Sequence, residues 1–594
     1  MLFRSEVKNI GSEPLDLRRF QFTRGIRFEF PDRSLGPGQR AIIVGNRPAF
    51  ESRYGAQWLV AGEYEGRLDN AGERIALIGP RGEPIHDFAY DADWHPIANG
   101  FGFSIVAVNE TAPLEQWHQA SGWRPSGAWS GSPAAEDPPF PDFPPVRVNE
   151  VLARPTAPMR DAIELHNAGS APADIGGWFL TDDYRDPKKF RIPDGTELPA
   201  VGFLVFRADD FGESNPATPF GLSAQGEEVY LFSGNAAGEL TGYVHGFDFG
   251  ASEVGATFGR HVISTGEEHF VTQVSQTLGG INDGPRTGPV VISEILYEPL
   301  PVFANGAFWN NTEDEYIELY NLSSMTVALE AWQLRDAVRF DFPQGAFLPA
   351  DTSLLVVAFD PAADPARLAA FRAQFQLPPD TLIFGPFEGN LDNGGETLSL
   401  SRADSVPTEE GAVVSWILMD QVRYRPEAPW PDSAAGRGDA LQRVDPAAYG
   451  NDPIAWIATT PRPGIPPSVD SDADGTPDLW ELSYGLDPND PLDAWQDPDE
   501  DGQSNLGEYS AGTDPLDPDS RLRIEEIRVG AGVALRFTAV ARRGYTVQFK
   551  DDLGGGSWTP LISVSARAET RTETVADLDA RQQRYYRLVL DSER

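Results

Sequence analysis

The chain of 594 residues contains no cysteine, which excludes disulfides, thiolate nucleophiles and cysteine-ligated zinc or iron–sulfur sites. It also lacks any apolar run near the roughly 18 residues that a membrane-spanning helix requires, so we expect no membrane insertion. Residues 1–20 are polar and charged, and we therefore expect no secretory signal at this position. Because domains average about 150 residues, the length predicts roughly four of them.

Basic residues are scarce, with 47 Lys and Arg against 90 Asp and Glu, which gives a net charge of −43. Nucleic-acid affinity depends on Lys and Arg that neutralise phosphates, so we expect no nucleic-acid partner. The 58 Gly and 51 Pro favour turns over long helices, while a hydrophobic content of 40% is sufficient for packed cores.

Signatures of catalysis are missing as well. The sequence has no Gly-x-Ser-x-Gly elbow, phosphate-binding loop, His-Glu-x-x-His pair or dinucleotide-binding glycine pattern. Its seven His are scattered without metal-ligand spacing. We therefore predict that this chain is not an enzyme.

An internal repeat is the clearest positive feature of the sequence. Three stretches carry a Glu-x-x-Asn motif and an aromatic residue eleven positions after the Asn. The three pairs are Asn9 and Phe20, Asn167 and Trp178, and Asn321 and Trp332. In each stretch a later Gly-Glu step precedes a strand-like run, at Gly72, Gly226 and Gly395. Short alternating runs between Gly, Pro and Asn are typical of a β-sandwich, so we expect the motif Asn and Glu to be structural and the tryptophans to be core.

The third copy resembles the lamin tail domain, through its opening at Val290–Ile295, its run Glu315–Asn321 and Trp332. The second copy matches at 146–150 and 163–167, and the first from Glu6 onward. The resemblance implies an immunoglobulin-like β-sandwich for each copy. We therefore predict an all-β fold with tandem sandwiches at residues 1–138, 145–287 and 289–466.

The first copy has no room for an opening strand. Only eight residues precede Asn9, whereas Asn149 in the opening strand of the second copy lies eighteen residues before Asn167. We expect the natural protein to begin upstream of Met1, where a signal peptide or a catalytic domain could lie. The alternative is a shorter sandwich whose missing strand is tolerated or supplied by another chain.

Residues 470–519 hold sixteen acidic residues and no Lys or Arg. Within them, two twelve-residue loops repeat with a period of 27 residues. Each loop has oxygen side chains at positions 1, 3, 5, 9 and 12 and Gly at position 6, which is the pattern of Ca²⁺-binding loops. The predicted ligands, with backbone carbonyls at position 7, are Asp470, Asp472, Asp474, Thr476, Asp478 and Glu481 in the first loop and Asp497, Asp499, Asp501, Gln503, Asn505 and Glu508 in the second.

A short helix is expected after each loop, over 479–484 and 506–511, whereas prolines exclude a helix before the first loop. The pattern resembles the thrombospondin type 3-like or dockerin-like calcium repeats of large secreted bacterial proteins. We expect residues 467–520 to form a spacer that Ca²⁺ makes rigid, with millimolar affinity. The alternative is a solvated acidic linker.

The sequence also supports predictions for two further segments, residues 521–594 and 300–314. Residues 521–594 contain thirteen basic and ten acidic residues and several strand-like runs, which predict a fibronectin III-like β-sandwich. The insertion 300–314 carries Phe303, Phe308 and Trp309. If exposed it is a candidate ligand-binding surface, and if buried it contributes only to packing.

The preferred interpretation is a non-catalytic extracellular or cell-surface bacterial protein that serves in adhesion, scaffolding or partner binding. Its partner would be a protein or a polysaccharide surface ligand. The alternative is the accessory portion of a secreted hydrolase, nuclease or spore-coat-type kinase whose catalytic domain lies outside this chain.

Overall fold

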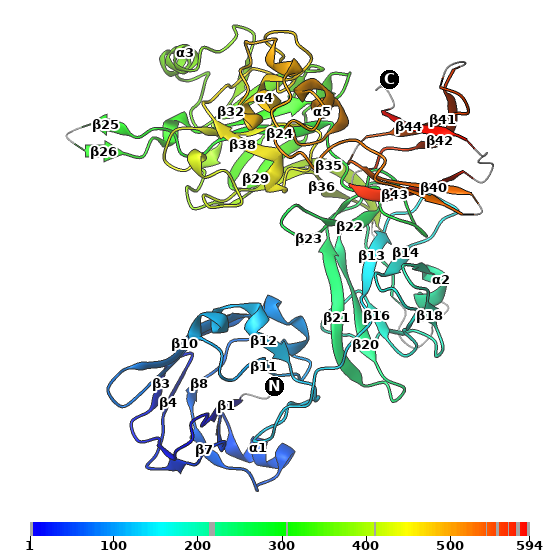
Figure 1. Cartoon of the computed structure of the whole chain (residues 1–594). Helices are drawn as coiled ribbons and strands as arrows, with labels where there is room; N and C mark the ends of the chain where they lie inside the picture. Colours follow the sequence, from blue (N-terminus) through cyan, green and yellow to red (C-terminus); the bar gives the residue numbers. More distant parts are fainter. Residues whose placement is uncertain are drawn as a thin grey trace. The chain divides into compact units, whose positions relative to one another are not determined.

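The computed structural model describes residues 4–212, 220–304, 307–408, 411–530, 532–541, 543–553, 557–567, 570–577 and 583–590 (Figure 1). The chain divides into two compact units, the first made of residues 1–148, 164–221 and 228–247, the second of residues 149–163, 222–227 and 248–594. Strands dominate both units, and the all-β prediction is confirmed. None of the helices in the described part is long and apolar enough to cross a membrane.

The first sandwich, as we name residues 4–137, lies in the first unit and has a five-stranded sheet of order β10-β9-β3-β4-β8 and a three-stranded sheet of order β1-β6-β7. Two further pairs are β2 with β5 and β11 with β12. Its core contains Phe22, Ile26, Ile43 and Leu77. Its elements are β1 (Arg4–Lys8), β2 (Leu15–Asp16), β3 (Gln21–Arg24), β4 (Ile26–Glu29), β5 (Ser34–Leu35), β6 (Arg40–Val44), α1 (Arg47–Tyr54), β7 (Val60–Glu63), β8 (Glu65–Gly66), β9 (Gly72–Ile78), β10 (Pro84–Asp91), β11 (Ile105–Ala107) and β12 (Trp123–Pro125).

Residues 146–287, which we name the second sandwich, contribute to both units. Within the first unit β16 pairs with β17 and β20, and within the second β22 pairs with β13 and β23. Trp178 is only 5% exposed, which confirms that it is a core residue. The elements are β13 (Val146–Leu152), β14 (Ala162–Asn167), β15 (Ala173–Asp174), β16 (Phe179–Thr181), β17 (Phe190–Arg191), β18 (Glu197–Leu198), β19 (Phe203–Arg207), α2 (Ala208–Phe211), β20 (Glu227–Gly234), β21 (Leu240–Phe249), β22 (Phe258–Val262) and β23 (Glu268–Thr272).

The third sandwich, residues 289–466, consists of two sheets that pack against each other. One has six strands in the order β33-β32-β27-β24-β37-β38, and the other has five in the order β34-β30-β29-β35-β36. Trp332 and Ile292 belong to the core between them, as the sequence predicted for the tryptophan. Helix α3 begins at a capping Asp364 and packs Phe371 against Tyr316 and Leu355, in a second apolar cluster. The elements are β24 (Val290–Leu296), β25 (Val302–Ala304), β26 (Ala307–Trp309), β27 (Tyr316–Asn321), β28 (Val327–Ala328), β29 (Trp332–Asp336), β30 (Val338–Asp341), β31 (Phe347–Leu348), β32 (Ser353–Val357), α3 (Pro365–Gln374), β33 (Leu382–Phe384), β34 (Glu388–Gly389), β35 (Thr397–Thr408), β36 (Gly411–Arg423), β37 (Ala440–Arg443) and β38 (Trp456–Thr459).

The repeated asparagines have one structural role. Asn321 is buried and its amide donates to the carbonyls of Met325, Leu348 and Pro349 at 2.8, 3.0 and 2.9 Å. Asn9 and Asn167 make the corresponding bonds in the first two sandwiches. The structural role predicted for these residues is therefore confirmed, because each one closes a turn by satisfying backbone carbonyls.

Two of the three repeated glutamates, Glu164 and Glu318, are buried, and Glu6 is partly exposed. Glu164 and Glu318 are 0% and 1% exposed. Glu318 accepts hydrogen bonds from the backbone N–H of Gly464 at 2.5 Å and from the Ser293 hydroxyl at 2.7 Å. The structural role predicted for the repeated glutamates therefore holds for Glu318, which caps neighbouring backbone.

The loop–helix insert, residues 467–520, contains two helices that start one residue before the predicted positions, α4 (Asp478–Tyr484) and α5 (Asn505–Ala511). The C-terminal module, from residue 521, forms two three-stranded sheets of order β39-β40-β43 and β42-β41-β44. Its strands are β39 (Glu526–Val529), β40 (Val533–Ala539), β41 (Tyr545–Lys550), β42 (Thr559–Val564), β43 (Arg571–Asp577) and β44 (Tyr585–Leu590). Short 3-10 helices occur at Ala92–Trp94, Pro96–Ala98, Leu114–His118, Ala120–Gly122, Thr312–Asp314, Asp432–Ala434, Pro453–Ala455 and Asp493–Trp495.

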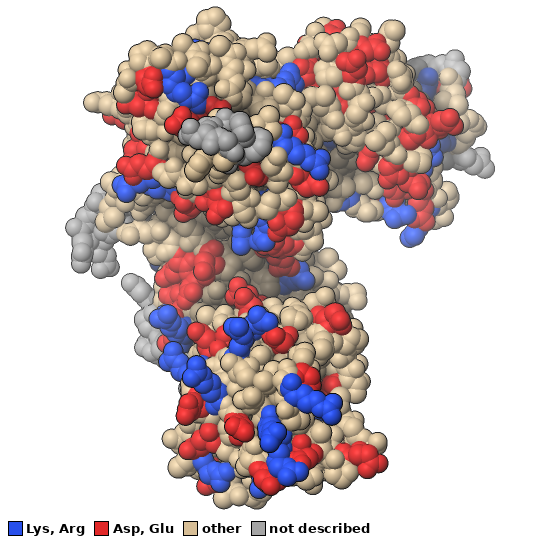
Figure 2. All heavy atoms as spheres, turned by 90° about the vertical axis from the view of Figure 1, so that its left-hand side faces the viewer, with Lys and Arg blue, Asp and Glu red and all other residues tan. Residues whose placement is uncertain are grey.

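Charge is distributed over the surface as well as concentrated in the insert. On the face drawn in Figure 2, acidic side chains gather in several patches and basic side chains lie among them. The net charge of −43 therefore has contributions from more than the insert.

Candidate metal centre

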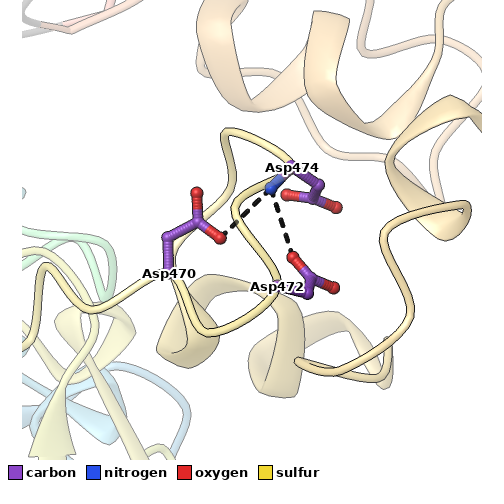
Figure 3. A group of neighbouring side chains, drawn as sticks. All are labelled: Asp470, Asp472 and Asp474. Carbon is purple, nitrogen blue, oxygen red and sulfur yellow. Dashed lines mark hydrogen bonds between the residues drawn. The ribbon is translucent and has the colours of Figure 1, made fainter.

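The first acidic loop is held in shape by its own carboxylates. One oxygen of Asp470 accepts the N–H groups of Ala473 and Asp474 at 2.7 and 3.3 Å, and the other accepts that of Gly475 at 3.0 Å. Asp472 also accepts the Asp474 N–H, at 3.2 Å. Figure 3 shows Asp470, Asp472 and Asp474 around one turn of the loop, and one oxygen of each lies within 4.8 Å of the others.

The second loop repeats this arrangement. Asp497 and Asp499 both accept the N–H of Asp501, each at 3.1 Å, and Asp497 also accepts that of Gly502 at 3.0 Å. One oxygen of Asp497, Asp499 and Asp501 lies within 4.8 Å of the others. The two loops therefore have the same internal geometry, as their 27-residue repeat predicts.

Each loop also leaves the same set of buried oxygens without a hydrogen-bond donor. In the first loop these are one oxygen of Asp472, one of Asp474 and both of Glu481. In the second loop they are the corresponding oxygens of Asp499, Asp501 and Glu508. Buried polar atoms are almost always hydrogen-bonded, and this repeated set of carboxylate oxygens without donors has the chemistry that a cation site requires.

The position-12 glutamates are the most unusual members of this set. Glu481 and Glu508 are both 0% exposed. Burial, followed by repulsion from Asp474 and Asp472, raises the pKa of the Glu481 carboxyl to about 8. Burial likewise raises the pKa of Glu508 to about 7. Such carboxyls fit a hard divalent cation, because oxygen ligands and bidentate glutamates are what Ca²⁺ prefers.

Asp478, at position 9 of the first loop, is directed elsewhere. Its carboxylate accepts the Ser471 N–H and hydroxyl at 2.7 and 2.8 Å and forms an ion pair with Arg462 at 2.5 Å. The Asp478 carboxylate thus already accepts two bonds from Ser471 of the insert and one from Arg462 of the third sandwich, and its role as a side-chain ligand stays a prediction. Its counterpart Asn505 keeps a buried side-chain oxygen without a donor.

Asp493 was not predicted from the sequence and lies beside the first loop. One oxygen of Asp474, Glu481 and Asp493 lies within 4.8 Å of the others. Asp493 is buried, and its second oxygen accepts the Asp487 N–H at 2.9 Å. Its counterpart one period later is Ser520, so no repeat in the sequence marked Asp493.

At the remaining predicted positions, Thr476 and Gln503, the side chains do not act as evident metal ligands. The Thr476 hydroxyl is buried and donates to Asp474 at 2.6 Å. The amide nitrogen of Gln503 is buried without a partner. For both residues the predicted ligand is the backbone carbonyl, and that prediction stays a prediction.

The two loops are joined to each other and to both neighbouring domains. The ring of Trp480, in α4, lies 5.3 Å from that of Tyr509 in α5. Arg543 of the C-terminal module donates to the Tyr509 carbonyl at 3.0 Å, and Arg521 donates to that of Asp501 at 2.8 Å. With the Arg462–Asp478 pair, these contacts link the insert to the domain on each side.

The insertion 300–314 forms the hairpin β25–β26, which projects from the third sandwich in Figure 1. Trp309 is 59% exposed, so of the two alternatives for this insertion the exposed one holds for this residue. The side chains of Phe303 and Phe308 lie outside the described part of the structure. The hairpin therefore offers one exposed tryptophan and no defined site.

Comparison with known proteins identifies a family for part of the chain. None of the curated proteins compared matches it. The family model described as Lamin Tail Domain matches residues 141–247 and 284–417, in the second and third sandwiches. The immunoglobulin-like β-sandwich implied by the resemblance agrees with the two facing sheets of the third sandwich. Two regions of the chain therefore match the lamin tail domain family.

Proposed function

We propose that residues 467–520 bind two Ca²⁺ ions and act as a rigid spacer in a non-catalytic, extracellular or cell-surface protein. The observation that supports this is the pair of buried glutamates, Glu481 and Glu508, whose four oxygens have no hydrogen-bond donor. Each glutamate faces carboxylates of its own loop, and a divalent cation would supply the charge that balances them.

The ligand set at each site follows from the oxygens that point inward. In the first loop Asp470, Asp472, Asp474, Glu481 and Asp493 would surround the ion. In the second loop Asp497, Asp499, Asp501, Asn505 and Glu508 would do so. Ca²⁺ takes 6–8 oxygen ligands, so the carbonyls of Thr476 and Gln503 and bidentate glutamates would complete each shell.

Ion binding would also affect the contacts that join the insert to the third sandwich and to the C-terminal module. Without a cation the clustered carboxylates of each loop repel one another, which opposes loop closure and the packing of Trp480 on Tyr509. With the charge balanced, the closed loops keep Asp478 on Arg462 at one end and Tyr509 on Arg543 at the other. The lamin-tail-like sandwiches would then present a surface for a protein or polysaccharide partner, in adhesion or scaffolding.

Calcium titration of the full chain after treatment with a chelator tests the proposal. We expect isothermal titration calorimetry to show two sites and tryptophan fluorescence to change in the same range, at about millimolar Ca²⁺. Glu481→Gln and Glu508→Gln should each weaken one site by at least about tenfold, since each removes a bidentate ligand. Glu500→Gln is the matched control, because Glu500 is an exposed acidic residue of the second loop outside the cluster.

A second pair of variants tests the ligand assignment in the first loop. Asp493→Asn should weaken the first site, whereas Asp478→Asn should weaken it less, because Asp478 is bonded to Ser471 and Arg462. No heat and no fluorescence change at millimolar Ca²⁺ would refute the proposal. Equal losses in Glu481→Gln and Glu500→Gln would show that only general charge matters.

A further inference from the structure

Strand β36 lies at the edge of the five-stranded sheet of the third sandwich, where it pairs with β35. The C-terminal part of this edge has partners within the sandwich. The Asp420 carboxylate accepts the Ile292 N–H at 2.8 Å, and the Asn451 side chain accepts the Arg423 N–H at 2.6 Å. The remaining part of the edge, residues 412–418, is the subject of this inference, and we name it the edge segment.

Alternate residues of the edge segment direct their backbone groups away from β35. On the far side of β35, the Ala403 N–H donates to the carbonyl of Ala331, directly before β29, at 2.9 Å. Because backbone groups alternate along a strand, the next residue of β35 faces β36 and bonds to its registered partner Ser415. The residues on either side of Ser415 therefore face the open edge. These outward-facing residues are Val414, Trp416 and, one further pair along, Leu418. For their N–H and C=O groups no backbone partner is found among the residues that the structure describes.

The side chains of this segment are apolar on both faces of the sheet. Ile417 and the adjacent Met419 belong to the core of the third sandwich, at 2% and 8% exposure. Val414, Trp416 and Leu418 lie on the other face, where they are 64%, 41% and 44% exposed. Their partners on β35 are the small residues Ser405, Ala403 and Ser401. An exposed apolar row therefore runs along the open edge.

This edge lacks the features that normally prevent a strand from pairing with another chain. Edge strands are usually short or carry charged residues or Pro. In this chain β33 and β34 have three and two residues, and β10 begins at Pro84 and carries Asp87. Strand β36 has thirteen residues, and its stretch 411–419 contains no charged residue and no Pro. The edge segment is therefore suited to pairing with another strand.

The edge segment is complementary to itself. In an antiparallel pair, residues directly opposite each other point to the same face of the sheet. A two-fold axis at Ser415 places residues 412–418 of one copy along the whole length of the same residues of another copy. Trp416 of each copy then lies opposite Val414 of the other, and aromatic and β-branched residues form favourable cross-strand pairs. Both of these residues direct their backbone groups to the open edge, so the hydrogen bonds of the two strands can be exchanged.

The charged residues nearest to the edge segment already have partners. On β35, Arg402 pairs with Glu253, and Asp404 pairs with Arg154 at 2.7 Å. The net charge of −43 on each copy is repulsive at longer range. Salt screens such repulsion, with a Debye length of about 8 Å at physiological ionic strength. Association through the edge segment should therefore become stronger as salt is added.

We propose that residues 412–418 of β36 pair in antiparallel orientation with the same residues of a second copy of this chain. The two five-stranded sheets would then form one continuous sheet across the two-fold axis. Such a contact is isologous and closes after two copies, so it gives a dimer and no filament. Pairing of one short segment buries less than the roughly 1,000 Å² of a stable interface, so the dimer dissociates on dilution. The proposal does not depend on Ca²⁺ binding.

Sedimentation velocity of the full chain tests the proposal. Between about 1 and 100 µM chain, we expect the average mass to rise from monomer toward dimer, and to rise further when NaCl is increased from about 50 to 500 mM. Trp416→Lys should raise the dimer dissociation constant at least about tenfold, because it places a charge in the paired edge. Val529→Lys is the matched control, since Val529 is 82% exposed on a different edge strand, β39.

Three outcomes would overturn the proposal. A chain that stays monomeric up to about 100 µM would leave a strand of another protein as the occupant of this edge. Equal effects of the two Lys variants would show that the edge segment has no special role. A dimer that dissociates as salt is added would be held by ion pairs and not by the edge segment.

Single cysteines locate the two-fold axis, because the natural chain contains none. Ser415→Cys would place two thiols directly opposite each other, within the range of a disulfide, and we expect covalent dimers after mild oxidation. Ser405→Cys is the matched control, because the two copies of β35 would be three strand spacings apart, about 14 Å. In hydrogen exchange, the Val414 and Trp416 amides should be protected only in the dimer, and the Ser415 amide in both states. Equal crosslinking of the two variants would contradict the proposed pairing.

Discussion

At the scale of single residues, the buried residues of the repeated motifs are of two kinds. Some have hydrogen-bond partners for their side chains within the protein, and others have none. Asn321 and Glu318 are buried and have protein partners for their side chains. Glu481 and Glu508 are equally buried and have none. Because leaving a buried charged group unpaired costs several kcal/mol, the second pair is the one that points to a ligand.

Glu294 and Glu318 make the third sandwich sensitive to pH. They lie opposite each other on β24 and β27, with Tyr316 and Arg462 as the other ionisable groups facing Glu294. Burial, followed by repulsion from Glu318, raises the pKa of Glu294, and burial raises that of Glu318. The folded chain therefore holds protons that the unfolded chain releases near the ordinary pKa of 4.5, and stability should fall as pH rises above that value.

Replacing Glu294 by Gln should remove this loss of stability at high pH. The amide oxygen of Gln can still accept the hydrogen bond from the Tyr316 hydroxyl, and the amide carries no charge. We expect Glu294→Gln to raise the Tm of the third sandwich by about 2–4 °C at pH 9 and to change it little at pH 5. Differential scanning calorimetry at both pH values measures this. Glu388→Gln, at an exposed position of β34, is the control, and a similar gain there would contradict the explanation.

At the scale of elements, the Gly-Glu turn before the long hairpin strand is the most constrained repeat. Gly395 has φ +88°, and a Cβ there would lie 2.6 Å from the Tyr424 carbonyl oxygen. Gly72 and Gly226 meet the carbonyls of Tyr90 and Phe249 in the same way. Glu396 then accepts the Asp392 N–H at 2.5 Å and closes the turn. The glycine is repeated because the backbone at the start of this strand lies directly against a carbonyl of the neighbouring strand, which leaves no space for a Cβ.

Gly395→Ala should therefore destabilise the third sandwich by about 2–3 kcal/mol, through both the left-handed backbone and the clash. Gly345→Ala is the matched control, since Gly345 has φ +80° and open space around its Cβ position. It should cost only about 1 kcal/mol. Urea denaturation of the full chain measures both, and equal losses would show that the close approach to Tyr424 is unimportant.

At the scale of the whole molecule, the insert is the segment whose order we propose to depend on bound Ca²⁺. The first and third sandwiches have apolar cores of their own, whereas residues 467–520 contribute few buried apolar side chains, among them Leu479 and Trp480. A segment with little apolar burial and unbalanced charge opens easily unless a bound ligand stabilises it.

Limited proteolysis should show this dependence. In a chelator, we expect the first cuts within residues 467–520, releasing a fragment that begins near the C-terminal module. At millimolar Ca²⁺ these cuts should slow by at least about tenfold, while cleavage elsewhere stays unchanged, because only closed loops gain stability from the ion. Mass spectrometry locates the cuts, and identical patterns in both conditions would argue against a calcium-dependent spacer.

The sequence by itself determined what depends on spacing along the chain. The 27-residue period located both acidic loops and, within one residue, the helices α4 and α5. The Asn-to-aromatic spacing located repeated sandwiches, and alternating runs predicted the all-β class, because strand and turn preferences are set by neighbouring residues.

Tertiary structure decided what depends on residues far apart in the chain. It brought Asp493 to the first loop and turned Asp478 toward Arg462. It buried Glu318 against Gly464, and it placed β1 and β11 on either side of one cavity. These neighbours arise only when the sheets pack, because packing sets which distant groups meet.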